Sequence, residues 1–260
     1  MNKVIIVTGA SRGIGKAVAA ALSAAGHTII GTSRTAPELE PLDVTDPASA
    51  QRLVHAVHAE HRRIDALVNN AGRAMLGPQE GFGPEQVADA FAVNVLGAMN
   101  VNRAVLPLMR AAGTGRLIHV SSVVGFLPAP FMGVYAATKH ALEGYATSLD
   151  EELRGSGVRS LIVRPGFMRT PIADGTVHGE PMDGYGDRPA RVEAAIARAF
   201  QTADDPAVVG RHVARLIAMA RPPAISAAGR EAKTLEQMAR LLPRAALLGG
   251  MRRQMGLGSS

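Results

Sequence analysis

Short apolar runs alternate with longer helical patterns along the chain, and this rhythm restricts the fold more than any other feature of the sequence. Ile14, Val18 and Leu22 recur every four residues ahead of Gly26, as in a helix with one apolar stripe. Longer helices are predicted over Pro84 to Ala112 and Val134 to Arg154. The predicted strands are Lys3 to Thr8, Thr28 to Thr32, a brief one near Leu42, Ala66 to Asn69, Arg116 to Val120, Val158 to Val163 and a weak one near Ala224. The alternation predicts an α/β fold, a doubly wound parallel sheet of the Rossmann type with helices on both faces.

The 260 residues contain no Pro/Ser/Gly-rich linker, so one domain over 1–260 is expected, with 171–205 as a substrate lid and 228–260 as a helical tail. The sequence has no cysteine, which excludes disulfides, cysteine-bound metals and a thiol nucleophile, and no metal site is expected. The apolar run Val4 to Val7 is too short for a signal peptide, and no stretch reaches the roughly 20 apolar residues of a membrane span. A cytoplasmic protein is expected.

The net charge of +6 is concentrated in the last part of the chain. Residues 206–260 hold nine Lys and Arg against two Asp and Glu, whereas residues 1–205 are close to neutral. The arginines are dispersed and are not interleaved with aromatic residues, so no nucleic-acid partner is predicted.

A glycine-rich segment, Thr8-Gly9-Ala10-Ser11-Arg12-Gly13-Ile14-Gly15, joins the first predicted strand to the first helix. Glycine allows positive φ and a close approach of phosphate to the backbone, and a helix N-terminus attracts anions. In this strand, turn and helix context, the segment predicts a dinucleotide-binding loop with the spacing GxxxGxG.

The TGxxxGxG spacing resembles that of the short-chain dehydrogenase/reductase family, and further segments match the family's motifs in order as far as about residue 170. They are Asn69-Asn70-Ala71-Gly72, Asn94-Val95, Ser122, Tyr135-Ala136-Ala137-Thr138-Lys139 and Pro165-Gly166 with Thr170. Residues 121–145 and 252–257 further resemble the branch of 17β-hydroxysteroid and retinol dehydrogenases. The resemblance implies an oxidoreductase that moves hydride between a nicotinamide cofactor and a carbonyl or secondary alcohol, in a homodimer or homotetramer.

Tyr135 and Lys139 lie four residues apart, so they share one face of the predicted helix. A tyrosine that exchanges protons near neutral pH needs its pKa lowered from about 10, and a neighbouring ammonium favours the phenolate. The resemblance implies Tyr135 as the catalytic acid/base, with Lys139 lowering its pKa and binding the nicotinamide ribose.

Ser122 and Asn94 complete the catalytic set that the resemblance implies. Ser122 would hold the substrate oxygen, and strand alternation directs the neighbouring Ser121 to the opposite face. Asn94 would position a water that links Lys139 to solvent, the alternative being a helix residue that faces solvent. His119 is interpreted as a core histidine with satisfied hydrogen bonds.

The end of the second strand predicts NADP(H) in preference to NAD(H). Enzymes that prefer NAD place an acid there, which repels a 2′-phosphate, but this chain reads Gly31-Thr32-Ser33-Arg34. Arg34 and Arg12 can instead bind a phosphate through forked hydrogen bonds. The link to the third strand is too short for the usual helix, so a turn is expected there. The resemblance implies further cofactor contacts by Gly9, Ser11, Gly13, Ile14, Gly15, Asp43, Asn69, Gly72, Pro165, Gly166 and Thr170, besides Tyr135 and Lys139.

The partner is expected to be a small-molecule carbonyl compound or alcohol that is hydrophobic and of medium or large size, steroid-like for example, because Phe126, Leu127, Phe131 and Met132 would line an apolar pocket. The alternative function is a regulatory protein that senses NADP without turnover. In the tail, Leu235, Met238, Leu241, Leu242, Ala245 and Leu248 form an apolar stripe. This stripe could cover the substrate cleft, contact another subunit or rest on an anionic membrane, and the first two roles are favoured.

Overall fold

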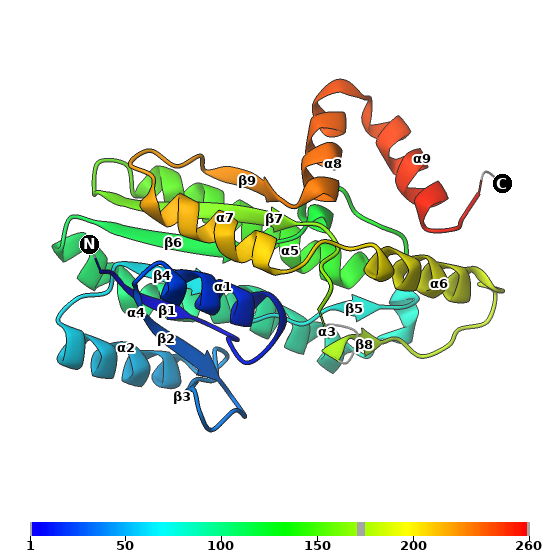
Figure 1. The fold of residues 1–260 in the computed structure, drawn as a ribbon. Helices are drawn as coiled ribbons and strands as arrows, with labels where there is room; N and C mark the ends of the chain where they lie inside the picture. Colours follow the sequence, from blue (N-terminus) through cyan, green and yellow to red (C-terminus); the bar gives the residue numbers. More distant parts are fainter. Residues whose placement is uncertain (1, 171–174, 259–260) are drawn as a thin grey trace.

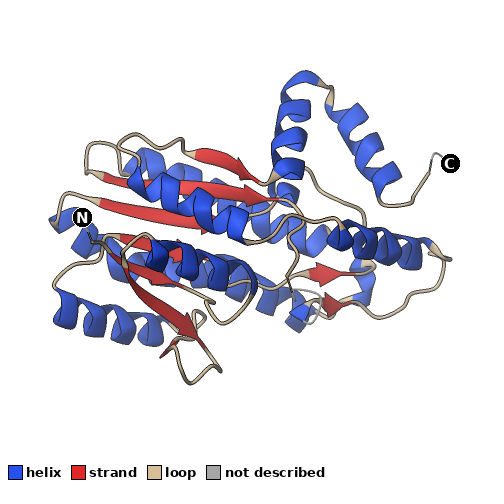
Figure 2. Ribbon diagram, in the orientation of Figure 1, coloured by secondary structure: helices blue, strands red, loops and turns tan. Residues whose placement is uncertain are grey.

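The structure is a computed structural model that describes residues 2–170 and 175–258. Within these ranges seven strands form one parallel sheet in the order β3-β2-β1-β4-β6-β7-β9 (Figures 1 and 2). The strands are β1 (Val4–Val7), β2 (Thr28–Ser33), β3 (Glu40–Pro41), β4 (Ala66–Asn69), β6 (Gly115–Val120), β7 (Val158–Pro165) and β9 (Ile225–Ala228). Because the strand order reverses at β1 and β4, the predicted doubly wound sheet is confirmed, and loops from both halves meet at its carboxyl edge.

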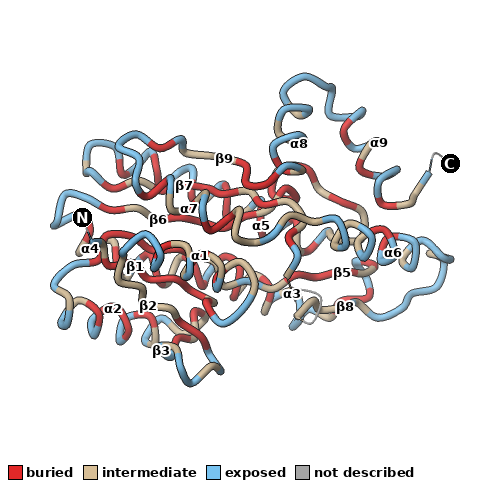
Figure 3. The backbone as a smooth tube through the Cα atoms, viewed as in Figure 1, coloured by how far each residue is buried: buried red, intermediate tan, exposed pale blue. Residues whose placement is uncertain are grey.

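Helices cover both faces of the sheet, which explains why strand β1 is buried along its whole length (Figure 3). Val18 and Val213 belong to a core on one face, between the sheet and helices α1 and α7. Val54 and Val101 belong to the core on the other face, below α2 and α4. The helices around the sheet are α1 (Gly13–Ala24), α2 (Pro47–His61), α3 (Pro84–Phe91), α4 (Gly97–Ala111), α5 (Gly133–Glu152) and α7 (Ala207–Ala218).

Two details of the helical pattern depart from regular α-helix. The segment predicted as one helix from Pro84 is α3 and α4 joined by a π-helix, Ala92–Leu96. Between β2 and β3 there is no helix, and residues 34–39 form the expected turn. In that turn the Ser33 hydroxyl accepts hydrogen bonds from the backbone N–H groups of Thr35 and Ala36.

The segment expected to act as a lid is partly regular structure. Strand β8 (Val177–His178) pairs with β5 (Met75–Leu76), and α6 (Arg188–Gln201) buries Val192 completely. No residue of 175–191 is buried, and the packed face of α6 begins only at Val192, so the lid role of 171–205 stays a prediction. Residues 171–174 lie outside the described residues.

The tail forms two helices, α8 (Arg230–Leu241) and α9 (Arg244–Gln254), which project as a hairpin beyond β9 (Figure 1). The predicted single apolar stripe is wrong, since Leu241 is 82% exposed and Leu242 and Leu248 are exposed as well. Pro243 starts a new helix and resets the periodicity, so Leu247 and Met251 take the buried positions of α9. No helix in the described ranges has the length and apolar character that a membrane crossing requires.

Candidate active site

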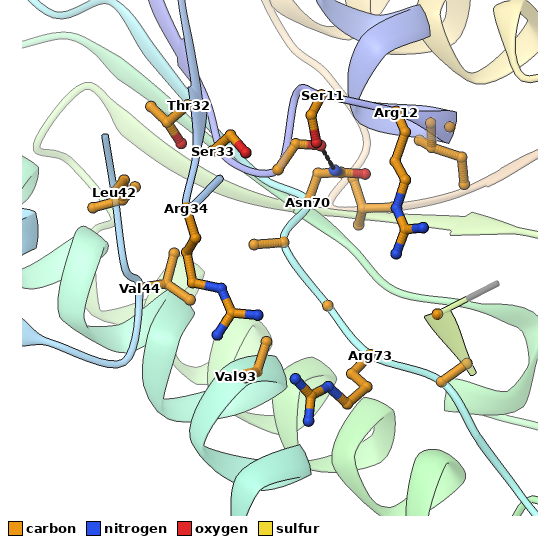
Figure 4. A pocket seen from close by; sticks show the side chains of 18 of the residues that line it. Ser11, Arg12, Thr32, Ser33, Arg34, Leu42, Val44, Asn70, Arg73 and Val93 are labelled. Carbon is orange, nitrogen blue, oxygen red and sulfur yellow. Dashed lines mark hydrogen bonds between the residues drawn. The ribbon is translucent and has the colours of Figure 1, made fainter. Parts of the chain in front are cut away.

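The glycine-rich loop between β1 and α1 has the backbone that its sequence predicts. Gly9 has φ of +66°, a conformation that side chains disfavour. A Cβ at Gly15 would overlap the carbonyl oxygen of Gly9, so only glycine lets α1 begin this close to the loop. The Asn70 amide fixes the loop from the other side, because its Nδ2 donates to the carbonyl oxygens of Thr8 at 3.0 Å and Gly9 at 3.1 Å (Figure 4).

A cavity of about 640 Å³, here called the basic cavity, opens at this loop. Among the described residues its lining contains four cationic side chains, Arg12, Arg34, Arg73 and Lys139, and one carboxylate, Asp43. The predicted site residues that line it are Gly9, Ser11, Arg12, Gly13, Ile14, Arg34, Asp43, Gly72, Tyr135, Lys139 and Thr170. The excess of positive charge suits a ligand that carries several phosphate oxygens.

The three arginines approach the basic cavity from three different loops, and Figure 4 shows their guanidinium groups in one region of space. Arg73 forms an ion pair with Asp89 of α3. Arg12 and Arg34 have no ion pair among the residues that the structure describes. Arg12 also lies at the N-cap of α1, where the helix dipole is positive, so this end of the cavity favours an anion.

Asp43 is the carboxylate in the lining of the basic cavity. Its Oδ1 accepts hydrogen bonds from Thr45, at 2.9 Å from the backbone N–H and at 2.7 Å from the hydroxyl. These bonds, helped by the charge of Arg34, lower the pKa of Asp43. The carboxylate is thereby held as an acceptor for a donor group of a ligand.

Asn69, for which the resemblance implies a cofactor contact, does not line the basic cavity. Its side chain is buried beside β4, where Nδ2 donates to Asn102 at 2.9 Å and lies 3.5 Å from Nδ1 of His119. Asn70, one residue later, lines the basic cavity and holds the loop. The correction follows from strand alternation, because neighbouring residues at the end of β4 point to opposite sides.

Three more of the predicted cofactor contacts lie outside the lining of the basic cavity. Gly15 packs beneath the loop. Pro165 and Gly166 line a second cavity, of about 110 Å³, here called the apolar cavity. Its lining is Ile14, Ala74, Leu76, Ser121, Ser122, Val123, Val124, Ala129, Met132, Tyr135, Pro165, Gly166, Phe167, Met168, Thr170, Thr176, Ile196, Phe200, Glu231, Leu235, Met251, Gln254 and Met255.

Tyr135 lines both cavities. Ser122 lies close enough to the Tyr135 hydroxyl to lower the pKa of Tyr135, and its Oγ accepts a long bond, 3.3 Å, from the backbone N–H of Val124. Ser121 also lines both cavities, but its hydroxyl is already engaged, because it donates to Glu143 at 2.7 Å. The choice of Ser122 over Ser121 therefore agrees with the geometry.

Lys139 is buried, and its Nζ donates to the carbonyl oxygen of Val120 at 2.9 Å. The Nζ lies 5.7 Å from the centre of the Tyr135 ring. Burial lowers the pKa of Lys139 to about 8 and raises the pKa of Tyr135 to about 12, the Ser122 hydrogen bond only partly opposing the rise. The lowered tyrosine pKa that the helix spacing predicts is not found, because desolvation of the phenolate dominates.

Asn94 lies in the π-helix and is buried, which excludes the solvent-facing alternative. Its Oδ1 accepts from the backbone N–H of Arg73 at 2.7 Å, and its Nδ2 donates to the Arg73 carbonyl and to the Thr138 hydroxyl, each at 2.9 Å. A Cβ on Gly72 would contact both Asn94 Oδ1 and Lys139 Nζ. The π-helix thus places this amide next to Lys139, and such insertions are frequent at functional sites.

His119 is a core residue, as interpreted, but its hydrogen bonds are not all satisfied. It is fully buried, and its Nε2 has no partner among the described residues. Burial, together with the charge of Lys139, lowers its pKa to about 3. It is therefore a neutral imidazole over the range in which enzymes are assayed.

The walls of the apolar cavity differ from the prediction. Met132 lines it, but Phe126 lies against the Arg164 guanidinium at 4.7 Å and Phe131 packs on Tyr185 at 5.6 Å, while Leu127 is buried in the core. The missing walls come from α6, α8 and α9, through Ile196, Leu235 and Met251 among others. Sequence spacing around Tyr135 carries no indication of these distant residues.

A family model for short chain dehydrogenases matches residues 3–181. The chain belongs to the short-chain dehydrogenase family. This short-chain dehydrogenase is 33% identical over 231 residues to the 3-ketodihydrosphingosine reductase of Bacteroides thetaiotaomicron, covering 85% of this chain and 86% of that protein. It is 34% identical over 184 residues to the 3-oxoacyl-(acyl-carrier-protein) reductase FabG of Escherichia coli, covering 66% of this chain and 75% of FabG.

A solved short-chain dehydrogenase from Streptomyces avermitilis superimposes with a TM-score of 0.83 at 31% identity, covering 100% of this chain and 98% of that one. Membership of the family makes the chain a nicotinamide-dependent oxidoreductase that acts on CH–OH or C=O groups. The alternative of a regulatory protein without turnover is therefore set aside.

Proposed function

We propose that this short-chain dehydrogenase uses NADP(H) to interconvert a hydrophobic ketone and its secondary alcohol. One observation carries the proposal: Tyr135 stands between a basic cavity suited to phosphates and an apolar cavity suited to a hydrophobic carbonyl compound. The cofactor supplies or accepts the hydride when it is bound. The relative that acts as a 3-ketodihydrosphingosine reductase supports an apolar substrate.

The preference for NADP(H) rests on the end of strand β2. Thr32, Ser33, Arg34 and Thr35 line the basic cavity there, and none of them carries a negative charge. Arg34 and Arg12 have no carboxylate partner among the described residues, so both guanidinium groups are available to phosphate oxygens. Asp43 and Gly72 would contact the nucleoside part, and the glycine-rich loop would hold the pyrophosphate.

Tyr135 and Ser122, which line the apolar cavity, and Lys139 and Asn94, which lie behind Tyr135, would share the catalytic work. Tyr135, with its raised pKa, holds its proton at neutral pH and would donate it to the carbonyl oxygen during reduction. Ser122 would hydrogen-bond that oxygen, and Lys139 would hold the ribose. Asn94 would keep the backbone at Arg73 in place beside Lys139.

The cofactor preference is tested by Arg34→Asp, with steady-state kinetics on NADPH and NADH and 2-decanone as the carbonyl substrate. A forked charge-assisted contact to phosphate accounts for about 10-fold to 100-fold in affinity. The ratio of kcat/KM for NADPH to that for NADH should therefore fall by about 10-fold or more in Arg34→Asp. Arg211→Asp, an exposed change of the same charge on α7, is the control. An unchanged ratio in Arg34→Asp would overturn the NADP assignment.

We also propose that the protein is cytoplasmic and assembles as a homodimer or homotetramer, as the family resemblance implies. Sedimentation velocity of the purified protein measures the assembly. A monomer at micromolar concentration would contradict it.

A further inference from the structure

One charged side chain lines the apolar cavity within the described residues, the carboxylate of Glu231 in the first turn of α8. Around it the lining consists of apolar side chains, backbone, hydroxyl groups and one amide, Gln254. Glu231 is partly exposed, and Gln254 beside it is exposed, so the carboxylate stands where the apolar cavity meets solvent. Its partners therefore decide what it does.

Glu231 has two hydrogen-bond donors. The backbone N–H of Phe167 donates to Oε2 at 2.9 Å, and Nε2 of Gln254 donates to Oε1 at 3.1 Å. Gly166 leaves room for the carboxylate, since a Cβ there would lie 2.7 Å from Oε2. A carboxylate has about four acceptor positions, so each oxygen keeps capacity for a further donor.

No cation lies within 4.0 Å of the Glu231 carboxylate among the described residues. Glu143 and Glu236 differ in this respect, because both pair with Arg164, at 2.5 Å and 3.6 Å. Glu236 also approaches Arg240 at 3.8 Å. Glu231, five residues before Glu236 on the same helix, lines the apolar cavity instead, and it has no positive partner within 4.0 Å among the described residues.

We propose that Glu231 binds a protonated amine on the substrate, so that the preferred substrates are apolar amino ketones and their amino alcohols. The inference rests on the proposed function, because it places the ammonium in the cavity that contains Tyr135 and Ser122. Glu231, Tyr135 and Ser122 line this one cavity of about 110 Å³, so the proposal places the amine near the reacting carbon. The apolar remainder of the substrate contacts Leu235, Met251 and Phe200.

The test compares 1-amino-2-decanol with 2-decanol, which differ by one amino group, in oxidation with NADP at pH 7. The measured quantity is the preference, the kcat/KM for the amino alcohol divided by that for the plain alcohol. A charge-assisted contact predicts that the wild type prefers the amino alcohol by about 10-fold or more. In Glu231→Gln this preference should be at least 10-fold smaller than in the wild type. Glutamine keeps an acceptor for the Phe167 N–H. Lys233→Gln, an exposed change on the same helix, should keep the wild-type preference.

Inhibition of the wild type by octylamine and by octanol gives a second measurement, which does not depend on the folding of a variant. Both compounds should compete with 2-decanol, and at pH 7 the inhibition constant of octylamine should be at least 10-fold lower than that of octanol. The inference would be overturned if the wild type had equal kcat/KM for 1-amino-2-decanol and 2-decanol. It would also be overturned by an unchanged preference in Glu231→Gln, or by equal inhibition by octylamine and octanol. Failure of the proposed function is recognised separately, since neither decanol would then reduce NADP.

Discussion

Replacing Lys139 with methionine is expected to stabilise the fold while removing activity. Lys139 is buried, and its pKa in the folded protein is about 8, against 10.5 for the free side chain. Below pH 8 the folded protein therefore holds an ammonium that it disfavours. Between pH 8 and 10.5 the unfolded chain still binds this proton while the folded protein has released it, so the destabilisation shrinks as pH rises.

The size of the effect follows from that difference in pKa. At 1.36 kcal/mol per pKa unit, the buried ammonium costs about 3 kcal/mol at pH 7 and about 1 kcal/mol at pH 9.5. The hydrogen bond to the Val120 carbonyl offsets about 1.5 kcal/mol of this, since methionine cannot replace it. The variant should then be more stable by about 1 to 2 kcal/mol at pH 7. Its advantage over the wild type should fall by about 2 kcal/mol on going to pH 9.5.

Urea unfolding followed by circular dichroism, without cofactor, gives the free energy of unfolding of the wild type and of Lys139→Met at pH 7 and at pH 9.5. Lys16→Met removes an exposed lysine of α1 and should show no such dependence on pH. A variant at Lys139 that is less stable than the wild type at pH 7, with a difference that does not change by pH 9.5, would refute the reasoning. NADPH binding and turnover should both be lost in Lys139→Met.

Two further substitutions separate binding from chemistry. Tyr135→Phe keeps the ring and its packing but removes the transferable proton, so NADPH affinity should stay within a few fold while kcat falls by about 10² to 10⁴; more than a tenth of the wild-type rate would contradict its role. Gly15→Ala places a methyl group against the Gly9 carbonyl and so displaces the loop. NADPH binding should weaken at least 10-fold, which is a loss of about 1.4 kcal/mol or more in binding free energy. In contrast, Gly144→Ala, which meets nothing within 4 Å, should bind NADPH as the wild type does, and calorimetric titration compares the two.

The sequence predicted those parts of the site that lie close together along the chain. Tyr135 and Lys139 share one helix face, and the glycine-rich loop follows a strand directly, so periodicity and turn chemistry were sufficient to place them. Burial could not be predicted in this way. The pKa of Tyr135 depends on how many elements surround it, and local spacing indicates only the neighbouring lysine.

The walls of the apolar cavity were beyond reach for a different reason. Glu231 and Met251 share the apolar cavity with Tyr135 although they lie about 100 residues later in the chain, and no short motif records such a neighbourhood. The same limit explains Arg73, whose place in the basic cavity depends on the loop after β4. Asn69 was assigned by motif matching. Neighbouring side chains at the end of β4 point to opposite sides, so Asn70 lines the basic cavity and Asn69 bonds to Asn102 instead.

The hairpin of α8 and α9 has an evolutionary consequence. It follows the last strand, adds nothing to the sheet, and contributes one wall of the apolar cavity but none of the basic cavity. Mutations in this hairpin can therefore change what the enzyme accepts while the hydride chemistry stays the same. The hairpin can therefore vary independently of the cofactor site. Grafting residues 230–258 onto a relative should transfer the substrate preference without transferring the cofactor preference.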